Sequence, residues 1–299
     1  MITASHITKN FDEVRAVDDV SLTIEEAKVF GLIGTNGAGK STFLRIAAGV
    51  LKQDDGHLLI DGREVFENPS VKGSFFYISD DPYFFSNGTP DDMAQFYAKI
   101  YPRYDLSRYA DLMRRFELNP KRKINTFSKG MKKQLAIILG LSAMTKYMYC
   151  DETFDGLDPV MRQGVKSLFA SDIAERGFTP VIASHNLREL EDICDSVGLL
   201  HQGGVLLSED IDHMKSDIHK IQLVPGQDGI ASLRDRLHIL NEETRGSLIT
   251  LTVKGNRDEI VDLLNKSEPV FLEVLPLSLE EIFISETGVE GYDIKKIIF

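Results

Sequence analysis

Short apolar runs separated by turn residues fill the beginning of the chain, a pattern that is typical of β-strands. They predict several strands between Ile2 and Ile33, the last of which is the buried run Val29–Ile33. Apolar residues then recur at helical spacing from Phe43 to Val50, and Leu58–Ile60 is a further predicted strand. We therefore expect a strand, a glycine-rich loop and a helix in that order up to Val50.

The period of the apolar residues changes at Thr89. This residue is a predicted N-cap, and Pro90 follows it at the first helical position. Two apolar stripes at helical spacing come next, formed by Met93, Phe96, Tyr97, Ile100 and Tyr101 and by Tyr109, Leu112, Met113 and Phe116. The pattern predicts a mainly helical insert over about residues 83–145.

The organisation changes again after Gly203-Gly204. Predicted strands and predicted helices alternate there, with strands at residues 221–224, 248–253 and 270–274 and helices near residues 233–237 and 260–264. We expect a main domain over residues 1–207 and a small α+β appendage over residues 208–299. The appendage has no cluster of His, Cys or carboxylate residues with ligand spacing, which favours interaction or regulation over chemistry.

Composition narrows the class of protein. A chain of 299 residues can bury a sizeable core, and its net charge of -12 argues against nucleic acid as a partner, because phosphate contacts need a basic surface. Only Cys150 and Cys194 are present, which favours a reducing cytosol. We expect no signal peptide and no membrane span, so any action at a membrane requires docking on another polypeptide.

One stretch carries a specific chemistry. It fits the phosphate-binding pattern G-x-x-x-x-G-K-[ST] and consists of Gly34, Thr35, Asn36, Gly37, Ala38, Gly39, Lys40, Ser41 and Thr42. Its glycines allow successive N–H groups to turn toward phosphate oxygens, and the following helix adds its positive N-terminal end. Lys40 can reach the β- and γ-phosphates, and the hydroxyl of Ser41 can ligate Mg²⁺. The sequence therefore predicts a nucleoside triphosphate site.

Two adjacent acids, Asp151 and Glu152, follow the apolar run Tyr147–Cys150, which is a predicted buried strand. Neighbouring residues at a strand end point in different directions. Asp151 can therefore hold Mg²⁺ through water, while Glu152 polarises the water that attacks the γ-phosphate. A solvated turn is the alternative for such a pair, and the phosphate loop upstream favours the catalytic interpretation.

Further motifs resemble the ATP-binding subunits of ABC transporters. Ser128 and Gly130 stand where the Ser and second Gly of the family's L-S-G-G-Q signature stand, although Lys129 and Met131 depart from it. Gly156-Leu157-Asp158 is similar to the family's D-loop, and His185 to its switch histidine. Phe11, before Val17, matches the aromatic that stacks on adenine. The resemblance covers about residues 1–207.

Two positions depart from the family pattern. Asp80 stands where the family usually has a Gln that contacts Mg²⁺ and water, and Thr153 replaces the usual Pro after the Asp-Glu pair. The carboxylate of Asp80 can bind Mg²⁺, yet it adds negative charge beside the phosphates. Asp80 is therefore either a catalytic and metal-binding residue or a plain surface acid.

The resemblance implies an α/β fold: a P-loop NTPase core with a mainly parallel sheet flanked by helices, the helical insert and the α+β appendage. It implies ATP and Mg²⁺ as cofactors, with Asp158, Ser128 and Gly130 contacting nucleotide across a head-to-tail homo- or heterodimer of nucleotide-binding domains. His185 would bind the γ-phosphate. The dimer would lie in the cytoplasm, peripheral to the inner face of the membrane, and power a separate integral membrane permease.

The Ser-Lys-Gly-Met signature and Leu279–Phe283 resemble exporter subunits, so the predicted direction is export. The run Tyr83-Phe84-Phe85 is either a docking surface for the permease or part of the insert's own core. Two other functions stay open from the sequence: a soluble ATP switch that uses the same motifs, and a regulatory subunit that binds ATP and hardly hydrolyses it.

Overall fold

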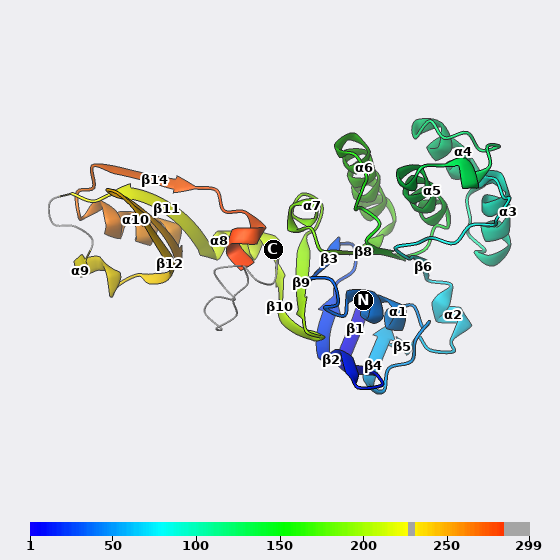
Figure 1. Cartoon of the computed structure of the whole chain (residues 1–299), viewed down its shortest axis with the longest axis horizontal. Helices are drawn as coiled ribbons and strands as arrows, with labels where there is room; N and C mark the ends of the chain where they lie inside the picture. The colour runs from blue at the N-terminus through cyan, green and yellow to red at the C-terminus, as the bar shows by residue number, and fades with distance from the viewer. Residues whose placement is uncertain (227–230, 284–299) are drawn as a thin grey trace. The chain divides into compact units, whose positions relative to one another are not determined.

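The computed structural model describes residues 1–226 and 231–283, and the chain forms two compact units, Met1–Ser208 and Glu209–Phe299. The first unit contains two sheets (Figure 1). The larger has the strand order β10-β9-β3-β8-β7-β6. Its strands are β3 (Phe30–Ile33), β6 (Phe75–Ile78), β7 (Tyr147–Asp151), β8 (Thr179–Ser184), β9 (Ser196–His201) and β10 (Gly204–Asp210). From β9 to β6 the neighbours are parallel, as expected for a P-loop NTPase core.

A second, antiparallel sheet precedes and follows the phosphate-binding loop in the chain, and the sequence did not separate it from the first. Its order is β2-β1-β4-β5, with β1 (Ile2–Phe11), β2 (Val14–Ile24), β4 (Asp55–Ile60) and β5 (Arg63–Glu64). The apolar residues of β1 and β2 alternate with exposed ones, because only one face of this sheet meets the core.

The main hydrophobic core joins this sheet to the parallel sheet through α1 (Lys40–Ala47). Phe43 and Leu44 of α1 are packed together with Tyr147 and Tyr149 of β7. The intervening residue Met148 points to the opposite face, where α5 (Lys129–Ser142) packs so closely that a Cβ on Gly140 would lie 2.7 Å from its sulfur. Helices therefore cover both faces of the parallel sheet, which explains why its central strands are fully buried runs.

The helical insert lies between β6 and β7, as its apolar stripes predict. It contains α3 (Pro90–Ile100), α4 (Leu106–Arg115), the short η1 (Ile124–Thr126) and α5 (Lys129–Ser142), and α5 contacts both α3 and α4 (Figure 1). Thr89 caps α3 and forms a capping box with Asp92, which confirms that the helix begins after Thr89. The other helices of this unit are α2 (Pro69–Lys72), α6 (Pro159–Arg176) and α7 (Leu187–Glu191).

The second unit has one antiparallel sheet of order β12-β13-β11-β14. Its elements are α8 (Ile211–Asp217), β11 (Ile218–Val224), α9 (Ala231–Arg234), β12 (His238–Arg245), β13 (Leu248–Lys254), α10 (Arg257–Asn265) and β14 (Phe271–Leu275). From β11 to β14 the elements follow the order β-α-β-β-α-β, which is a split β-α-β fold. The first and third of its strands, β11 and β13, lie in the centre of the sheet. Residues 279–283 begin a helix capped by Ser278 and Glu281.

Two details of the appendage differ from the sequence prediction. The helix expected near residues 233–237 is α9 (Ala231–Arg234), and a turn follows it. Strand β12 was missed because most of its residues are polar and partly or fully exposed, as suits a strand at a sheet edge.

Candidate active site

Three parallel strands bring the predicted site residues together. The phosphate-binding loop follows β3, Asp151 ends β7 before Glu152, and His185 follows β8. In the register of the sheet, Asp151 lies opposite Ala183, and Ile33 lies opposite Ser184. The carboxyl ends of these strands therefore meet at one edge of the sheet, which is where ligands bind in open α/β sheets.

The backbone of the loop explains two of its glycines. Gly37 and Gly39 have φ values of 82° and 101°, in the left-handed region that favours glycine. A Cβ on Gly39 would also lie 2.4 Å from the carbonyl oxygen of Ala16, so a larger residue does not fit. Helix α1 starts directly after Gly39 without a side-chain cap, which suits an anion at its N-terminus.

Lys40 connects this loop to the acids. Its side chain is only 4 % exposed, and Nζ donates to the carbonyl oxygens of Gly34 at 2.6 Å and Thr35 at 3.1 Å. Nζ also lies 3.2 Å from Oε1 of Glu152. Within the same loop, the N–H of Ala38 donates to Thr35, Asn36 is exposed, and Thr42 is half-buried in the first turn of α1. The lysine is thus held across the loop, beside the predicted catalytic carboxylate.

Ser41 and Asp151 provide oxygen ligands of the kind that Mg²⁺ prefers. The hydroxyl of Ser41 donates to Oδ1 of Asp151 at 2.8 Å, and that of Tyr77 donates to Oδ2 at 3.3 Å. Burial raises the pKa of Asp151, although the bond from Ser41 opposes this, and burial beside Asp151 raises the pKa of Tyr77 to about 12. A hydroxyl next to a buried carboxylate fits a hard divalent cation.

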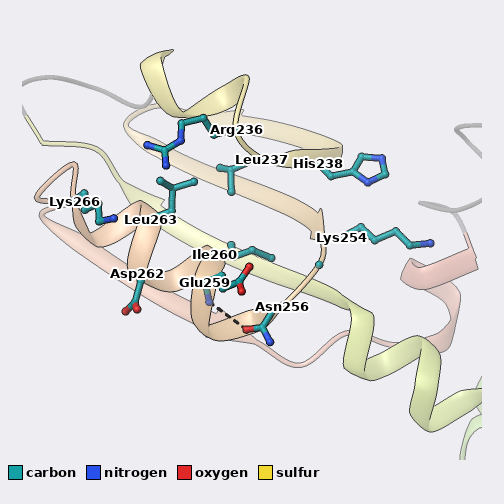
Figure 2. A pocket seen from close by; sticks show the side chains of 11 residues that line it. Arg236, Leu237, His238, Lys254, Asn256, Glu259, Ile260, Asp262, Leu263 and Lys266 are labelled. Atoms are coloured by element: carbon teal, nitrogen blue, oxygen red, sulfur yellow. Dashed lines mark hydrogen bonds between the residues drawn. The ribbon is translucent and has the colours of Figure 1, made fainter.

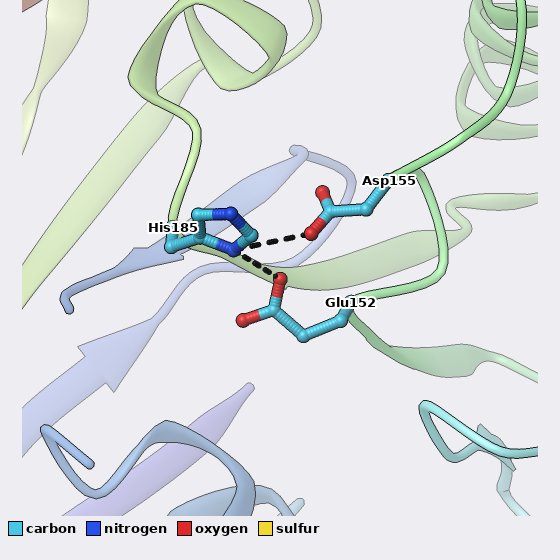
Figure 3. A group of neighbouring side chains, drawn as sticks. All are labelled: Glu152, Asp155 and His185. Atoms are coloured by element: carbon cyan, nitrogen blue, oxygen red, sulfur yellow. Dashed lines mark hydrogen bonds and ion pairs between the residues drawn. The ribbon is translucent and has the colours of Figure 1, made fainter. Parts of the chain in front are cut away.

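Glu152, Asp155 and His185 form the second part of the site (Figure 3). Nδ1 of His185 lies 2.9 Å from Oε2 of Glu152 and 3.1 Å from Oδ2 of Asp155. Burial and a hydrogen bond with Asp155 raise the pKa of Glu152. Burial also acts to raise the pKa of Asp155, but hydrogen bonds from Glu152, Glu189 and Ser184 outweigh it and lower the pKa.

The signature residues lie at the start of α5. Ser128 caps this helix by accepting a hydrogen bond from the N–H of Met131 at 3.2 Å. A Cβ on Gly130 would lie 3.6 Å from the carbonyl oxygen of Gly156 in the predicted D-loop. The start of α5, the predicted D-loop and the catalytic side chains together line a cavity of about 450 Å³. Its lining residues are Asn36, Asp80, Lys129, Gly130, Lys133, Glu152, Asp155, Gly156 and His185.

Phe11, Val17 and Asp158 do not line this cavity, whereas Asp80 does. Phe11 is 45 % exposed at the end of β1, with Nζ of Lys9 5.7 Å from its ring centroid, whereas Val17 is fully buried in the core. Asp158 caps α6 by accepting from the N–H of Met161 at 2.9 Å. Asp80 is 62 % exposed, and its Oδ1 lies 3.6 Å from Nζ of Lys133. Nucleotide contacts by Phe11, Val17 and Asp158 stay predictions.

Sequence reasoning missed four residues beside the site: Tyr77, Lys133, Asp155 and Glu189. Asp155 had a detectable signal, because it is a third acid directly before Gly156-Leu157-Asp158. Tyr77 and Lys133 had none, because an aromatic in a strand and a lysine in a helix are ordinary residues. Glu189, on α7, is held by Arg162 at 3.3 Å, and burial and a hydrogen bond with Asp155 raise its pKa to about 7.

The appendage has a cavity of its own, of about 490 Å³ (Figure 2). Leu237, Ile260 and Leu263 give it apolar walls, and lysine, arginine and acidic side chains surround them. Its charged residues are spread around the rim rather than gathered at one point (Figure 2). It therefore lacks the convergence of charged groups that defines the site in the first unit.

The fold and the site together define a P-loop ATPase. The family model for the ABC transporter matches residues 17–155. The chain is 32 % identical to the ABC transporter ATP-binding protein YtrB of Bacillus subtilis (strain 168), over 96 % of this chain and 98 % of that protein. It belongs to the family of ABC transporter ATP-binding proteins.

Two further comparisons agree. The chain is 28 % identical to the bacitracin transport ATP-binding protein BcrA of Bacillus licheniformis, over 99 % of this chain and 97 % of that protein. A solved structure of the ATP-binding subunit of an ABC transporter is 26 % identical, with a TM-score of 0.67 over 72 % of this chain and 92 % of that one. Both YtrB and BcrA match through the appendage as well as the ATPase core.

Proposed function

We propose that this protein hydrolyses ATP to drive a separate membrane permease, in the direction of export. The observation that carries the proposal is the convergence of Lys40, Glu152 and His185 at the carboxyl ends of three adjacent strands, with Nζ of Lys40 and Nδ1 of His185 3.2 Å and 2.9 Å from the Glu152 carboxylate. A cation for phosphate, a base for water and an imidazole for the γ-phosphate are the groups that phosphoryl transfer to water requires.

The roles follow from the contacts. Backbone N–H groups of Gly34–Thr42 and the ammonium of Lys40 bind the phosphates. Ser41 and Asp151 would hold Mg²⁺, which would supply positive charge to neutralise the phosphates. Glu152 accepts the proton of the attacking water. Its raised pKa, caused by burial and by Asp155, makes it a better proton acceptor than an ordinary carboxylate. His185 donates to the γ-phosphate.

One protomer does not complete the site. Ser128 is exposed at the N-terminus of α5, and Asp158 is exposed at the N-terminus of α6. Helix N-termini attract phosphate, so these ends suit the nucleotide of a second nucleotide-binding domain, either another copy or a related chain. Hydrolysis and phosphate release would remove the charge that both protomers bind, which favours separation of the two domains.

A surface for the permease is available on the helical insert. Tyr83 is 74 % exposed, and its ring contacts Phe85, which in turn packs edge-on against Phe96 of α3. Phe85 thus packs on the helical insert, whereas Tyr83 is exposed and available to a partner. In the described part of the chain, the helices are too short or too polar to cross a bilayer. As its family implies, we place the protein in the cytoplasm, bound to the membrane through its permease.

Phosphate release by the wild type and by Glu152→Gln tests the proposal. We expect Glu152→Gln to bind ATP with affinity close to that of the wild type and to turn it over at least about 100-fold more slowly, because the general base is lost. Glu175→Gln, at an exposed position of α6, is the matched control and should keep full turnover. Equally slow release by wild type and Glu152→Gln would instead identify a regulatory subunit that binds ATP.

Copurification tests the transport part separately. We expect the full-length chain to be isolated from membranes with a hydrophobic permease, and the complex to show ATP-dependent transport. Release of an active, partner-free ATPase from cells would favour the soluble switch.

A further inference from the structure

A second buried lysine lies beside the catalytic carboxylate, outside the phosphate-binding loop. Lys133, on α5 of the helical insert, is only 3 % exposed. Its Nζ donates to the backbone carbonyl oxygens of Glu152 and of Asp155, the latter at 2.9 Å, and lies 3.6 Å from Oδ1 of Asp80. An ammonium group has three donors, and the two carbonyl oxygens accept from two of them, while Asp80 is an ion-pair partner beyond hydrogen-bond distance.

The carbonyl that Lys133 holds belongs to a strained residue. Glu152 has a φ of 48°, in the left-handed region that costs a residue with a side chain about 1 kcal/mol or more. Its N–H donates to Ala183 of β8 at 2.9 Å, and its carbonyl accepts from Lys133. Both backbone groups of Glu152 are thus fixed, and this conformation aims its carboxylate at Lys40 and His185.

Asp80 is the only carboxylate side chain within ion-pair distance of Lys133 among the described residues. A buried ammonium is unfavourable without a counter-charge, and two neutral carbonyls do not provide one. Asp80 lies in the loop after β6, and its carboxylate is largely exposed while one oxygen faces Lys133. Both interpretations of Asp80 that the sequence allowed stay predictions, and this contact adds a third, that of a counter-ion.

We propose that Lys133 is a positioning residue that holds Glu152 in its reactive conformation, with Asp80 as its counter-ion rather than a ligand of Mg²⁺. The inference rests on the proposed function, since it assumes that Glu152 activates water. Lys133 belongs to the helical insert, and Asp80 belongs to the loop that precedes the insert. A shift of either element would change the hydrogen bond from Lys133 to the Glu152 carbonyl, so the insert acts on the reaction through this lysine.

Lys133→Met is the direct test in the full-length chain, because methionine keeps the length of the side chain and removes the donors. We expect kcat for ATP hydrolysis to fall about 100-fold, since a misplacement of about 1 Å has an effect of that size. ATP affinity should stay within about threefold of the wild type, because the Lys40 loop has its own contacts. The neighbouring Lys132→Met, on the same helix, should keep wild-type kcat.

Asp80→Asn separates the counter-ion from the metal ligand at an exposed position where folding is not at risk. We expect kcat to fall about threefold and the Mg²⁺ concentration for half-maximal activity to stay unchanged. Asp80→Asn added to Lys133→Met should lower kcat no further, because the two residues act as one unit. A tenfold rise in the Mg²⁺ requirement would overturn the assignment of Asp80 as counter-ion.

Wild-type kcat in Lys133→Met would overturn the inference while leaving the proposed function intact. An equal loss of ATP affinity and kcat would also overturn it, because Lys133 would then support nucleotide binding. If Lys133→Met fails to fold, the Asp80→Asn variant still tests the inference. An unchanged kcat in Asp80→Asn would refute the role of Asp80 as counter-ion of Lys133. No ATP turnover in the wild type would refute the proposed function, and this inference with it.

Discussion

The two units of the chain use buried polar groups in different ways. In the first unit, Lys40, Lys133 and Asp151 are buried charged groups whose contacts converge on a few atoms around Glu152 and Ser41. In the described part of the appendage, the buried polar side chains are His219 and Thr252, and His219 lies 3.1 Å from the carbonyl oxygen of Gly255. Charge is buried at a cost only where it performs chemistry or ties elements together.

One buried charge in the first unit has a structural role. Asp172 of α6 accepts from Arg108 of α4 and from Arg176 of its own helix, at 2.5 Å and 2.7 Å. These pairs connect the helical insert to α6 and involve no residue of the nucleotide site. Convergence of several charged groups, rather than burial of one, therefore distinguishes the site from the scaffold.

Lys40→Ala should have the largest effect. Loss of a buried charge that contacts phosphate costs about 3 kcal/mol, so we expect ATP to bind at least about 100-fold more weakly. Titration with a fluorescent ATP analogue measures this. Lys254→Ala, which removes a lysine from the rim of the appendage cavity, is the matched control and should leave ATP affinity unchanged. Equal affinity in both variants would remove the distinction between the units.

His185→Ala should have the next largest effect. We expect ATP binding to persist and kcat to fall about 100-fold, as for the loss of one donor to a developing negative charge. Steady-state phosphate release with an ATP-binding assay separates the two quantities. His57→Ala, at an exposed pair with Glu64, should change neither. A loss of binding equal to the loss of kcat would mean that His185 binds ATP and does not act in the reaction.

Leu251→Ala tests the appendage as a packed scaffold. Leu251 is fully buried under α10 in the appendage core, so the truncation should destabilise this unit by about 2–5 kcal/mol. Denaturant unfolding measures the change, and Thr250→Ala, on the opposite face of β13, should be nearly neutral. ATP turnover at low temperature should be unaffected. A large loss of turnover in the folded variant would show that the appendage contributes to the reaction.

Glu189→Gln should have the smallest effect, and its sign depends on pH. The pKa of Glu189 rises from 4.5 to about 7 on folding, because it is buried and hydrogen-bonded to Asp155. Between pH 4.5 and about 7 the folded state therefore binds more protons than the unfolded state, and stability falls as pH rises.

We expect Glu189→Gln to lack this component, so its thermal stability should fall less than that of the wild type across the same pH window. Thermal melts at several pH values between 4.5 and 7.5 measure the difference. Parallel curves for the two proteins would show that Glu189 titrates normally. Such a result would also count against the hydrogen bond between Glu189 of α7 and Asp155, the acid that contacts His185.

The sequence by itself determined the parts of this protein that depend on neighbouring residues. The loop from Gly34 to Thr42 needs left-handed glycines and a helix start, and both requirements are local. The N-cap at Thr89 and the buried strand before Asp151 are local as well. The family resemblance implied that Lys40, Glu152 and His185 act at one site, and the structure explains this by three adjacent parallel strands whose carboxyl ends lie at one edge.

Only the tertiary structure decided which ordinary residues join the site. Tyr77 meets Asp151, and Lys133 meets the backbone of Glu152, across long stretches of chain. The separate antiparallel sheet and the polar edge strand β12 were also decided by pairing partners rather than by periodicity. Periodicity reports which face of an element is buried. It contains no information on which distant side chain will meet that face, because the packing of the whole domain fixes that choice.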